Sequence, residues 1–227
     1  MDIVLFVAME EEEQAFLELF DFARRSFHDT VYYEAEIGAH TLRMFRTKIG
    51  KVHAAQALTR VACSFDVDVF MSVGIAGGVH APLGGIVLAR GAFYHDVDVT
   101  PFGYAPGQIP GHDTVFLSDE THLASMKRTL DTLAYRYTVG LIATGDQFLT
   151  DDVPLRPFYE RYQDIAAVDM ESAAIAHTAT LHDASFLAVR GISDILGEAD
   201  QLDDHEQRVV RALNSVTEAV SHWVGHL

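Results

Sequence analysis

Short, continuous apolar runs recur along the chain and predict strands buried on both faces, as in parallel sheets. They occupy residues 2–8, 67–74, 85–94, 138–145, 166–170 and 186–194. Two further apolar segments, 31–37 and 41–47, flank Gly38 and predict a hairpin. The second run is expected to end at the glycine-rich sequence "GIAGG", residues 74–78, for which a tight turn is the structural interpretation.

Between these runs, apolar residues recur every three or four positions, which predicts helices. The helical segments are 11–22, 50–65, 119–134, 171–181 and a tail from about residue 203. In the second of them, Ala54, Leu58, Val61 and Phe65 share one face. Residues 95–111 are rich in glycine and proline and predict a long loop, a feature that is usually functional.

The alternation of strands and helices predicts one α/β domain over residues 1–227. Its sheet is expected to be central and mostly parallel, with helices on both faces. No apolar run reaches the ~20 residues of a membrane span. The first run ends in four glutamates, which indicates a strand rather than a signal peptide.

Composition narrows the possible partners. The formal net charge is −17, which disfavours nucleic acids and anionic membranes. The single cysteine, Cys63, excludes an intrachain disulfide and a cysteine-based zinc cluster, and we expect it to be buried on its helix. Together these features indicate a cytoplasmic protein that binds neither nucleic acid nor membrane.

Candidate chemistry follows from what each strand places at its carboxyl end, where α/β sheets bind ligands. The expected edge gathers carboxylates, one arginine, methionines and an aromatic ring, and it lacks metal-binding sequence patterns. Most of these residues also have a structural interpretation, because glutamates favour helix starts and Phe148 or Met170 would suit a core. Glu171 is harder to explain structurally, since it precedes a small-residue helix that is expected to be buried. The convergence favours an acidic, metal-free site.

The chain resembles a known family, the 5'-methylthioadenosine/S-adenosylhomocysteine nucleosidases of the purine nucleoside phosphorylase superfamily. The similarity covers nearly the whole chain and rests on motifs in matching order. They are "VAMEEE", "KIGKVHAA", "GIAGG", "YHDVDVTPFGYAPGQIPG", "TGDQFL", "VDMESAAIA" and "VRGISD". The resemblance implies a three-layer, nucleoside phosphorylase-like sandwich with a mixed sheet, and a homodimer without cofactor. It also implies hydrolysis of the N-glycosidic bond between adenine and a 5'-thio-substituted ribose.

The resemblance further implies roles for particular residues. Glu12, helped by Arg190, would activate water; Glu171 would bind the ribose hydroxyls and stabilise positive charge on the sugar; Asp194, oriented by Ser193, would protonate N7 of adenine. Phe148 would stack on adenine and the Leu149 backbone would read its edge. Met9, Ile49 and Met170 would line the sugar and alkylthio pocket, and Phe102 and Pro110 would reach the partner subunit's site. Ile75 would also bind substrate, at a position near the ribose or water where many relatives carry a small hydroxyl residue.

The chemistry explains why such a site should be acidic, because cleaving a glycosidic bond develops positive charge on the sugar. Two alternatives remain open. One is a related superfamily enzyme, either a futalosine-type nucleoside hydrolase or a purine nucleoside phosphorylase, whose phosphate could be bound by Arg43, Arg46 and Lys48. The other is a catalytically silent nucleoside-binding protein, which the presence of Glu12, Glu171 and Asp194 disfavours.

Overall fold

The computed structural model describes residues 1–198 and 205–227 of the chain. The strands are β1 (Asp2–Val7), β2 (Ala23–Phe27), β3 (Thr30–Ile37), β4 (His40–Arg46), β5 (Val69–Gly78), β6 (Ile86–Tyr94), β7 (Phe116–Leu117), β8 (Tyr137–Thr144), β9 (Ile165–Asp169) and β10 (Ser185–Ile195). The helices are α1 (Glu10–Leu19), α2 (Lys51–Ala62), α3 (Glu120–Thr132), α4 (Arg156–Tyr159), α5 (Ser172–Leu181) and α6 (His205–Gly225). Short 3-10 turns occupy Thr100–Phe102 and Val153–Leu155.

One mixed sheet runs through the molecule in the order β10-β6-β8-β9-β5-β1-β4-β3-β2, with β7 paired to β6. Because β10 also pairs with β5, the strands β5, β10, β6, β8 and β9 close into a ring. Among the described residues, five strand pairings are parallel and five are antiparallel. The sheet is therefore mixed, with the two kinds of pairing in equal number, whereas the apolar runs predicted a mostly parallel sheet.

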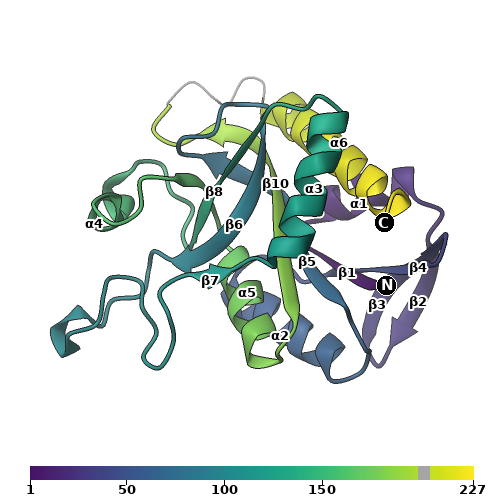
Figure 1. Cartoon of the computed structure of the whole chain (residues 1–227), viewed down its shortest axis with the longest axis horizontal. Coiled ribbons are helices and arrows are strands. Elements are labelled where there is room, and N and C mark those ends of the chain that lie inside the picture. The colour runs from purple at the N-terminus through teal and green to yellow at the C-terminus, as the bar shows by residue number, and fades with distance from the viewer. Residues whose placement is uncertain (199–204) are drawn as a thin grey trace.

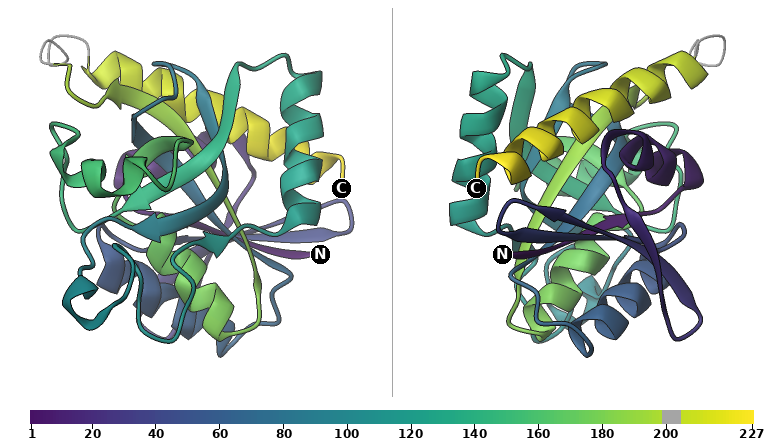
Figure 2. Two further views of the ribbon diagram at one scale, coloured as in Figure 1. Left: turned by 60° about the vertical axis from the view of Figure 1, so that its left-hand side comes forward. Right: turned by 90° about the vertical axis from the view of Figure 1, so that its right-hand side faces the viewer.

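Helices cover both faces of the sheet and give three layers (Figures 1 and 2). Phe16 of α1, Met126 of α3 and Trp223 of α6 belong to one hydrophobic cluster. Leu58 of α2 and Ile175 of α5 belong to the cluster on the opposite face. The predicted α/β architecture is confirmed.

Several local predictions need correction. The first helix ends at Leu19 instead of continuing to residue 22, and the chain turns into β2, an exposed strand that the apolar pattern did not predict. Cys63 follows the last residue of α2 and is exposed rather than buried. Phe65 lies beyond that helix, although it still packs against the core. The predicted start of the tail helix, near residue 203, lies outside the described residues.

The glycine-rich stretch 74–78 is also different from the prediction, because it continues β5 instead of forming a turn. Its residues pair with Arg190–Ile195 of β10, so that strand likewise continues past Asp194. The strands β1, β4, β5 and β10 run in one direction, and β6, β8 and β9 run in the other. The candidate site residues therefore lie where the carboxyl end of β5 pairs antiparallel with β9, not along one edge of a parallel sheet.

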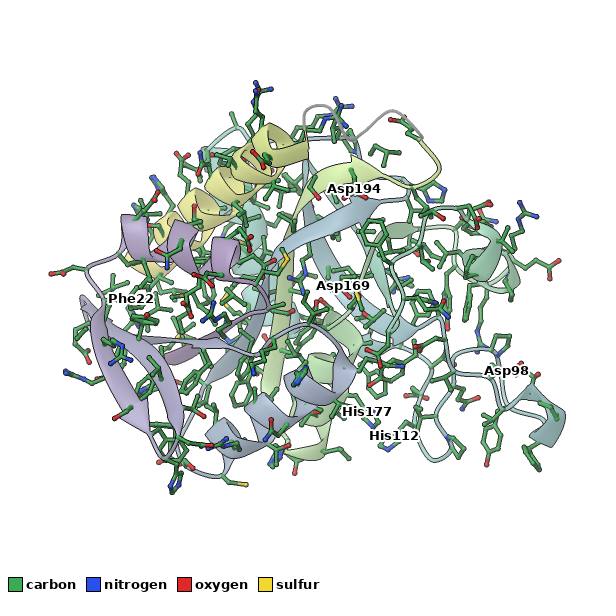
Figure 3. All side chains as sticks on the ribbon, turned by 180° about the vertical axis from the view of Figure 1, so that it is seen from behind. Phe22, Asp98, His112, Asp169, His177 and Asp194 are labelled. Carbon is green, nitrogen blue, oxygen red and sulfur yellow. The ribbon has the colours of Figure 1, made fainter. Side chains whose placement is uncertain are left out.

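Residues 95–115, between β6 and β7, form the predicted long loop, which projects from the body of the molecule (Figure 1). Asp98 marks it at the side of the view in Figure 3, well away from the central Asp169. Phe102, in the turn Thr100–Phe102, is 81% exposed.

Candidate active site

Arg190 lies in the middle of β10 and is almost completely buried. Its Nε donates a hydrogen bond to Asp169 Oδ2 at 3.0 Å, and its Nη2 donates to Ser72 Oγ at 2.7 Å. The other carboxylate oxygen of Asp169 accepts from Thr144 Oγ1 at 2.6 Å. Hydrogen bonds of this kind make it possible to bury an arginine and a carboxylate together. Arg190 and Asp169 form the centre on which the site is built.

Glu12 lies in the first turn of α1, and its carboxylate is buried. Glu12 Oε2 accepts from the N–H groups of Ala8 and Met9 at 2.7 and 3.0 Å, and Oε1 accepts from the Ile75 N–H at 3.0 Å. Burial raises the pKa of Glu12 above its ordinary value, although the positive charge of Arg190 acts in the opposite direction. Glu12 is therefore fixed in place and holds a proton more readily than a surface glutamate.

Gly74 of β5 allows Glu12 and Arg190 to approach each other. A Cβ on Gly74 would lie 2.0 Å from Glu12 Oε1 and 2.7 Å from Arg190 Nη1. Such distances are impossible for a real side chain, and the φ of +150° at this position also favours glycine. The glycine of "GIAGG" thus creates space for two charged groups rather than a turn.

Glu171 directly precedes α5 and is buried beside the same arginine. Its Oε1 accepts a hydrogen bond from the Gly50 N–H at 2.8 Å, and its Oε2 lies 3.9 Å from Arg190 Nη2. Burial raises the pKa of Glu171 to about 7, and the neighbouring Asp169 adds to the effect while Arg190 opposes it. Glu171 therefore exchanges its proton near neutral pH, as residues at functional sites often do.

Asp194 lies four residues beyond Arg190 on β10 and is partly exposed. Ser193 is buried, and its Oγ donates to Asp194 Oδ1 at 2.7 Å. A Cβ on Gly77 would lie 3.0 Å from Asp194 Oδ2, so the carboxylate rests against β5. In Figure 3, Asp194 is labelled above the central Asp169.

The apolar residues expected at the site fall into two groups. Met9, Ile75, Leu149 and Met170 are partly buried. Ile49 and Phe148 are 51% and 76% exposed. Phe102 and Pro110 lie on the projecting loop and are exposed, so the structure does not bring them to the charged centre of their own chain.

Several hydrogen-bonding groups at this centre were not predicted from the sequence. Ser72, Thr144 and Ser172 bind Arg190 or Asp169, and the Gly50 N–H binds Glu171. Ser72 is a polar residue inside an otherwise apolar stretch of β5, and Thr144 ends the apolar stretch of β8, which was a visible signal. The donation from Gly50 joins residues 121 positions apart and left no signal.

Within residues 1–198 and 205–227, no three His, Cys, Asp or Glu side chains are grouped so as to hold a metal ion. The carboxylates of the site instead accept hydrogen bonds from backbone N–H groups, hydroxyls and Arg190. None of the helices in the described part of the chain is long and apolar enough to cross a membrane.

Comparison with known proteins identifies relatives of nearly the whole chain. The model of the phosphorylase superfamily matches residues 2–223. A 5'-methylthioadenosine/S-adenosylhomocysteine nucleosidase from Hydrogenovibrio crunogenus is 34% identical, and the match covers 100% of this chain and 99% of the relative. The chain belongs to the 5'-methylthioadenosine/S-adenosylhomocysteine nucleosidase family.

Solved structures of this nucleosidase family have the same fold. The enzyme from Neisseria meningitidis, in complex with methylthio-immucillin-A, gives a TM-score of 0.90 at 30% identity over 100% of this chain and 99% of that one. The S-adenosylhomocysteine nucleosidase from Streptococcus pyogenes, in complex with 5-methylthiotubericidin, gives a TM-score of 0.90 at 30% identity over 100% and 97%. As a member of a nucleosidase family, the chain is a hydrolase of N-glycosidic bonds.

Proposed function

We propose that this nucleosidase hydrolyses 5'-methylthioadenosine and S-adenosylhomocysteine, releasing adenine and the 5-thio-substituted ribose. The names of its relatives support the substrates. The observation that carries the proposal is the cluster of three buried carboxylates, Glu12, Asp169 and Glu171, around the buried Arg190. A protein built only for stability gains little from so much buried charge.

Glu171 is proposed to stabilise the oxocarbenium-like transition state and to bind the ribose hydroxyls. Its carboxylate is buried and accepts a hydrogen bond from the Gly50 N–H, so it is preorganised to face a developing cation. The group must be ionised for this task. Because its pKa is about 7, we expect kcat/KM to fall as the pH drops below neutrality.

Glu12 is proposed to activate the attacking water, with Arg190 helping to orient it. A carboxylate offers about four acceptor positions. Backbone N–H groups of Ala8, Met9 and Ile75 use three of them in Glu12. One position therefore remains for a water molecule, and the raised pKa makes Glu12 a better base than an exposed glutamate.

Asp194 is proposed to protonate N7 of the leaving adenine. The hydrogen bond from Ser193 orients the carboxyl group of Asp194, and its partial exposure leaves it accessible to the adenine ring of a substrate. General-acid catalysis of this kind contributes about 100-fold to 10,000-fold in rate.

The apolar residues are proposed to select the ligand. Phe148 is exposed enough to stack on adenine, with the Leu149 backbone reading the base edge. Met9, Ile49 and Met170 are proposed to line the sugar and alkylthio pocket, and Ile75 is proposed to lie near the ribose or the water. In a proposed homodimer, Phe102 and Pro110 of one subunit would close the pocket of the other.

The arginines do not favour the phosphorylase alternative. Arg43 is held by Asp2 and Glu34, and Arg46 by Glu10 and Glu13. Arg46 and Lys48 line a groove of about 600 Å³ between α2 and the strands β2 to β4, and the lining of that groove does not include Glu171. Arg43 and Arg46 are thus paired, and Lys48 lines a groove that does not contain the proposed ribose-binding Glu171.

One assay tests the function and its alternative together. The enzyme is incubated with methylthioadenosine, S-adenosylhomocysteine, adenosine, inosine and a futalosine-type nucleoside, with and without phosphate, and free base is measured. We expect adenine release from the two 5'-thio nucleosides without phosphate. Turnover that requires phosphate, or turnover of the futalosine-type nucleoside alone, would overturn the proposal.

A further inference from the structure

We propose that Lys51, Asp96 and Asp146 form a positioning clamp that holds the Gly50 N–H against Glu171. None of the three side chains is proposed to touch substrate. The inference rests on the proposed function only in giving Glu171 a catalytic task. It extends the site to residues that no step of the proposed mechanism uses.

The clamp is defined by four contacts. Lys51 Nζ lies 2.6 Å from Asp96 Oδ2 and 3.8 Å from Asp146 Oδ2. The Lys51 N–H donates to Asp146 Oδ1 at 2.8 Å, and the Asp146 N–H donates to Asp96 Oδ2 at 2.9 Å. Each of the three residues thus contacts both of the others.

These contacts join three separate elements. Lys51 is the first residue of α2, Asp96 follows β6 by two residues, and Asp146 follows β8 by two residues. Gly50 precedes Lys51, and Phe148 follows Asp146 by two positions. The clamp therefore connects the donor to Glu171 with the loop that carries the proposed adenine-binding residues.

The cluster is better shielded than an ordinary surface ion pair. The side chains of Lys51 and Asp96 are 23% and 14% exposed, and that of Asp146 is 47% exposed. Burial alone would raise the pKa of Asp96, yet the hydrogen bond and charge of Lys51 hold that pKa below its ordinary value. The Lys51 ammonium also lies 5.4 Å from the centre of the Tyr94 ring.

Gly50 is the part of the site that needs such a clamp. Its φ is +102°, in the region that favours glycine, and a Cβ there would lie 3.1 Å from Asp146 Oδ1. A glycine has unusual freedom to rotate its backbone, so its N–H would not by itself stay directed at Glu171. The preceding loop is strained as well, since Lys48 has a φ of +75°. Fixing Lys51 on two carboxylates fixes the direction of the Gly50 N–H.

The other groups that face Glu171 come from elements outside the clamp. Asp169 at the end of β9 and Glu12 of α1 act to raise its pKa, and Arg190 of β10 acts to lower it. The Gly50 N–H also lowers it and comes from the segment before α2. Loss of this donor should therefore make Glu171 harder to ionise.

The test compares Lys51→Met with Asp96→Asn in otherwise intact enzyme. A positioning role predicts that both variants raise the pH at which kcat/KM falls, by about half a unit to one unit, since both release the donor. A purely long-range charge effect predicts opposite shifts, because one variant removes a positive charge and the other a negative charge. Same-direction shifts support the clamp, and opposite shifts or unchanged profiles overturn it.

The matched control is Arg60→Met, which removes a paired cation from the other end of α2. It should keep the wild-type pH profile. With the clamp variants we expect kcat/KM to fall about 10-fold at pH 6 and less at pH 8, as slight misplacement of a catalytic group does. Asp146→Ala removes the acceptor of the Lys51 N–H at a half-exposed position. It replaces Lys51→Met or Asp96→Asn if either does not fold, and the same upward shift is expected.

A second readout does not depend on turnover. The carboxyl ¹³C signal of Glu171, identified by its loss in Glu171→Gln, is titrated in wild type and in each variant. An upward shift of its pKa in both Lys51→Met and Asp96→Asn supports the clamp even if no nucleoside is hydrolysed, whereas an unchanged pKa overturns it. The nucleoside assay alone decides the proposed function.

Discussion

The charged centre and the apolar rim of this site differ in how far a single chain completes them. The charged centre consists of buried, hydrogen-bonded residues: Glu12 of α1, Asp169 of β9, Glu171 just before α5, and Arg190 of β10. Ile49, Phe148 and Phe102 are exposed and lie on connections between elements.

The difference follows from the free-energy cost of burying a charged group compared with that of exposing an apolar one. A buried charge without partners costs far more than an exposed apolar side chain, so the fold must complete the charged centre by itself. An exposed phenyl ring is tolerated in the single chain, and under the proposed function it gains contacts from a ligand or a second subunit. In the proposed mechanism, charge stabilisation is therefore preorganised, whereas recognition of the 5' group depends on contacts that form on binding.

The largest expected effect comes from removing the only cation of the cluster. Arg190→Met should lower the free energy of unfolding by about 3–5 kcal/mol near neutral pH, because buried carboxylates lose their partner. Urea unfolding measures this loss. Arg156→Met, which breaks an exposed ion pair with Asp152, should change stability by less than about 1 kcal/mol. A similar small change for Arg190→Met would mean that the centre is not a cooperative charge cluster.

Asp194→Asn keeps the shape of the proposed acid and removes its transferable proton. We expect turnover of methylthioadenosine to fall at least about 100-fold, with binding largely kept, because the lost interaction belongs to the transition state. Single-turnover kinetics and calorimetry separate the two quantities. Near wild-type adenine release would remove Asp194 from the mechanism.

Glu171→Gln tests whether the centre was built at the expense of stability. The pKa of Glu171 is about 7 when folded and 4.5 ordinarily, so protonated Glu171 stabilises the fold. That contribution is fully present below the ordinary value and is lost as the pH rises through about 7. The glutamine variant should therefore exceed wild type in stability by about 1–3 kcal/mol at pH 8 and not at pH 4, while losing activity. Thermal unfolding across this pH range measures it, with the exposed Glu18→Gln as control.

The smallest effect is expected at the rim. Phe102→Ala should leave unfolding within about 0.5 kcal/mol of wild type, because the ring is exposed in the single chain. If the ring closes the partner's pocket, the apparent affinity for methylthioadenosine should fall about 10-fold. Leu19→Ala, at an exposed position on α1, is the matched control. Unchanged affinity, or full activity of a monomer in sedimentation, would contradict the shared pocket.

Much of this protein could be read from local pattern. The apolar runs located β1, β5, β6, β8, β9 and β10, because a strand covered on both faces leaves a continuous apolar signal. The exposed strand β2, "ARRSF", left no such signal and was missed. The carboxylate of Glu171 was noticed because it interrupts an apolar run.

What the sequence by itself determined was therefore most of the buried strands and the longer helices, together with the acidic, family-specific residues between them. Only the tertiary structure decided that β10 pairs with both β5 and β6, so that residues from opposed strands meet around Arg190. It also decided that Gly74 makes room for Glu12 and that the Gly50 N–H reaches Glu171. The physical reason is that pattern records whether a residue is buried, whereas partners far apart in sequence are chosen by strand pairing and by the need to neutralise buried charge.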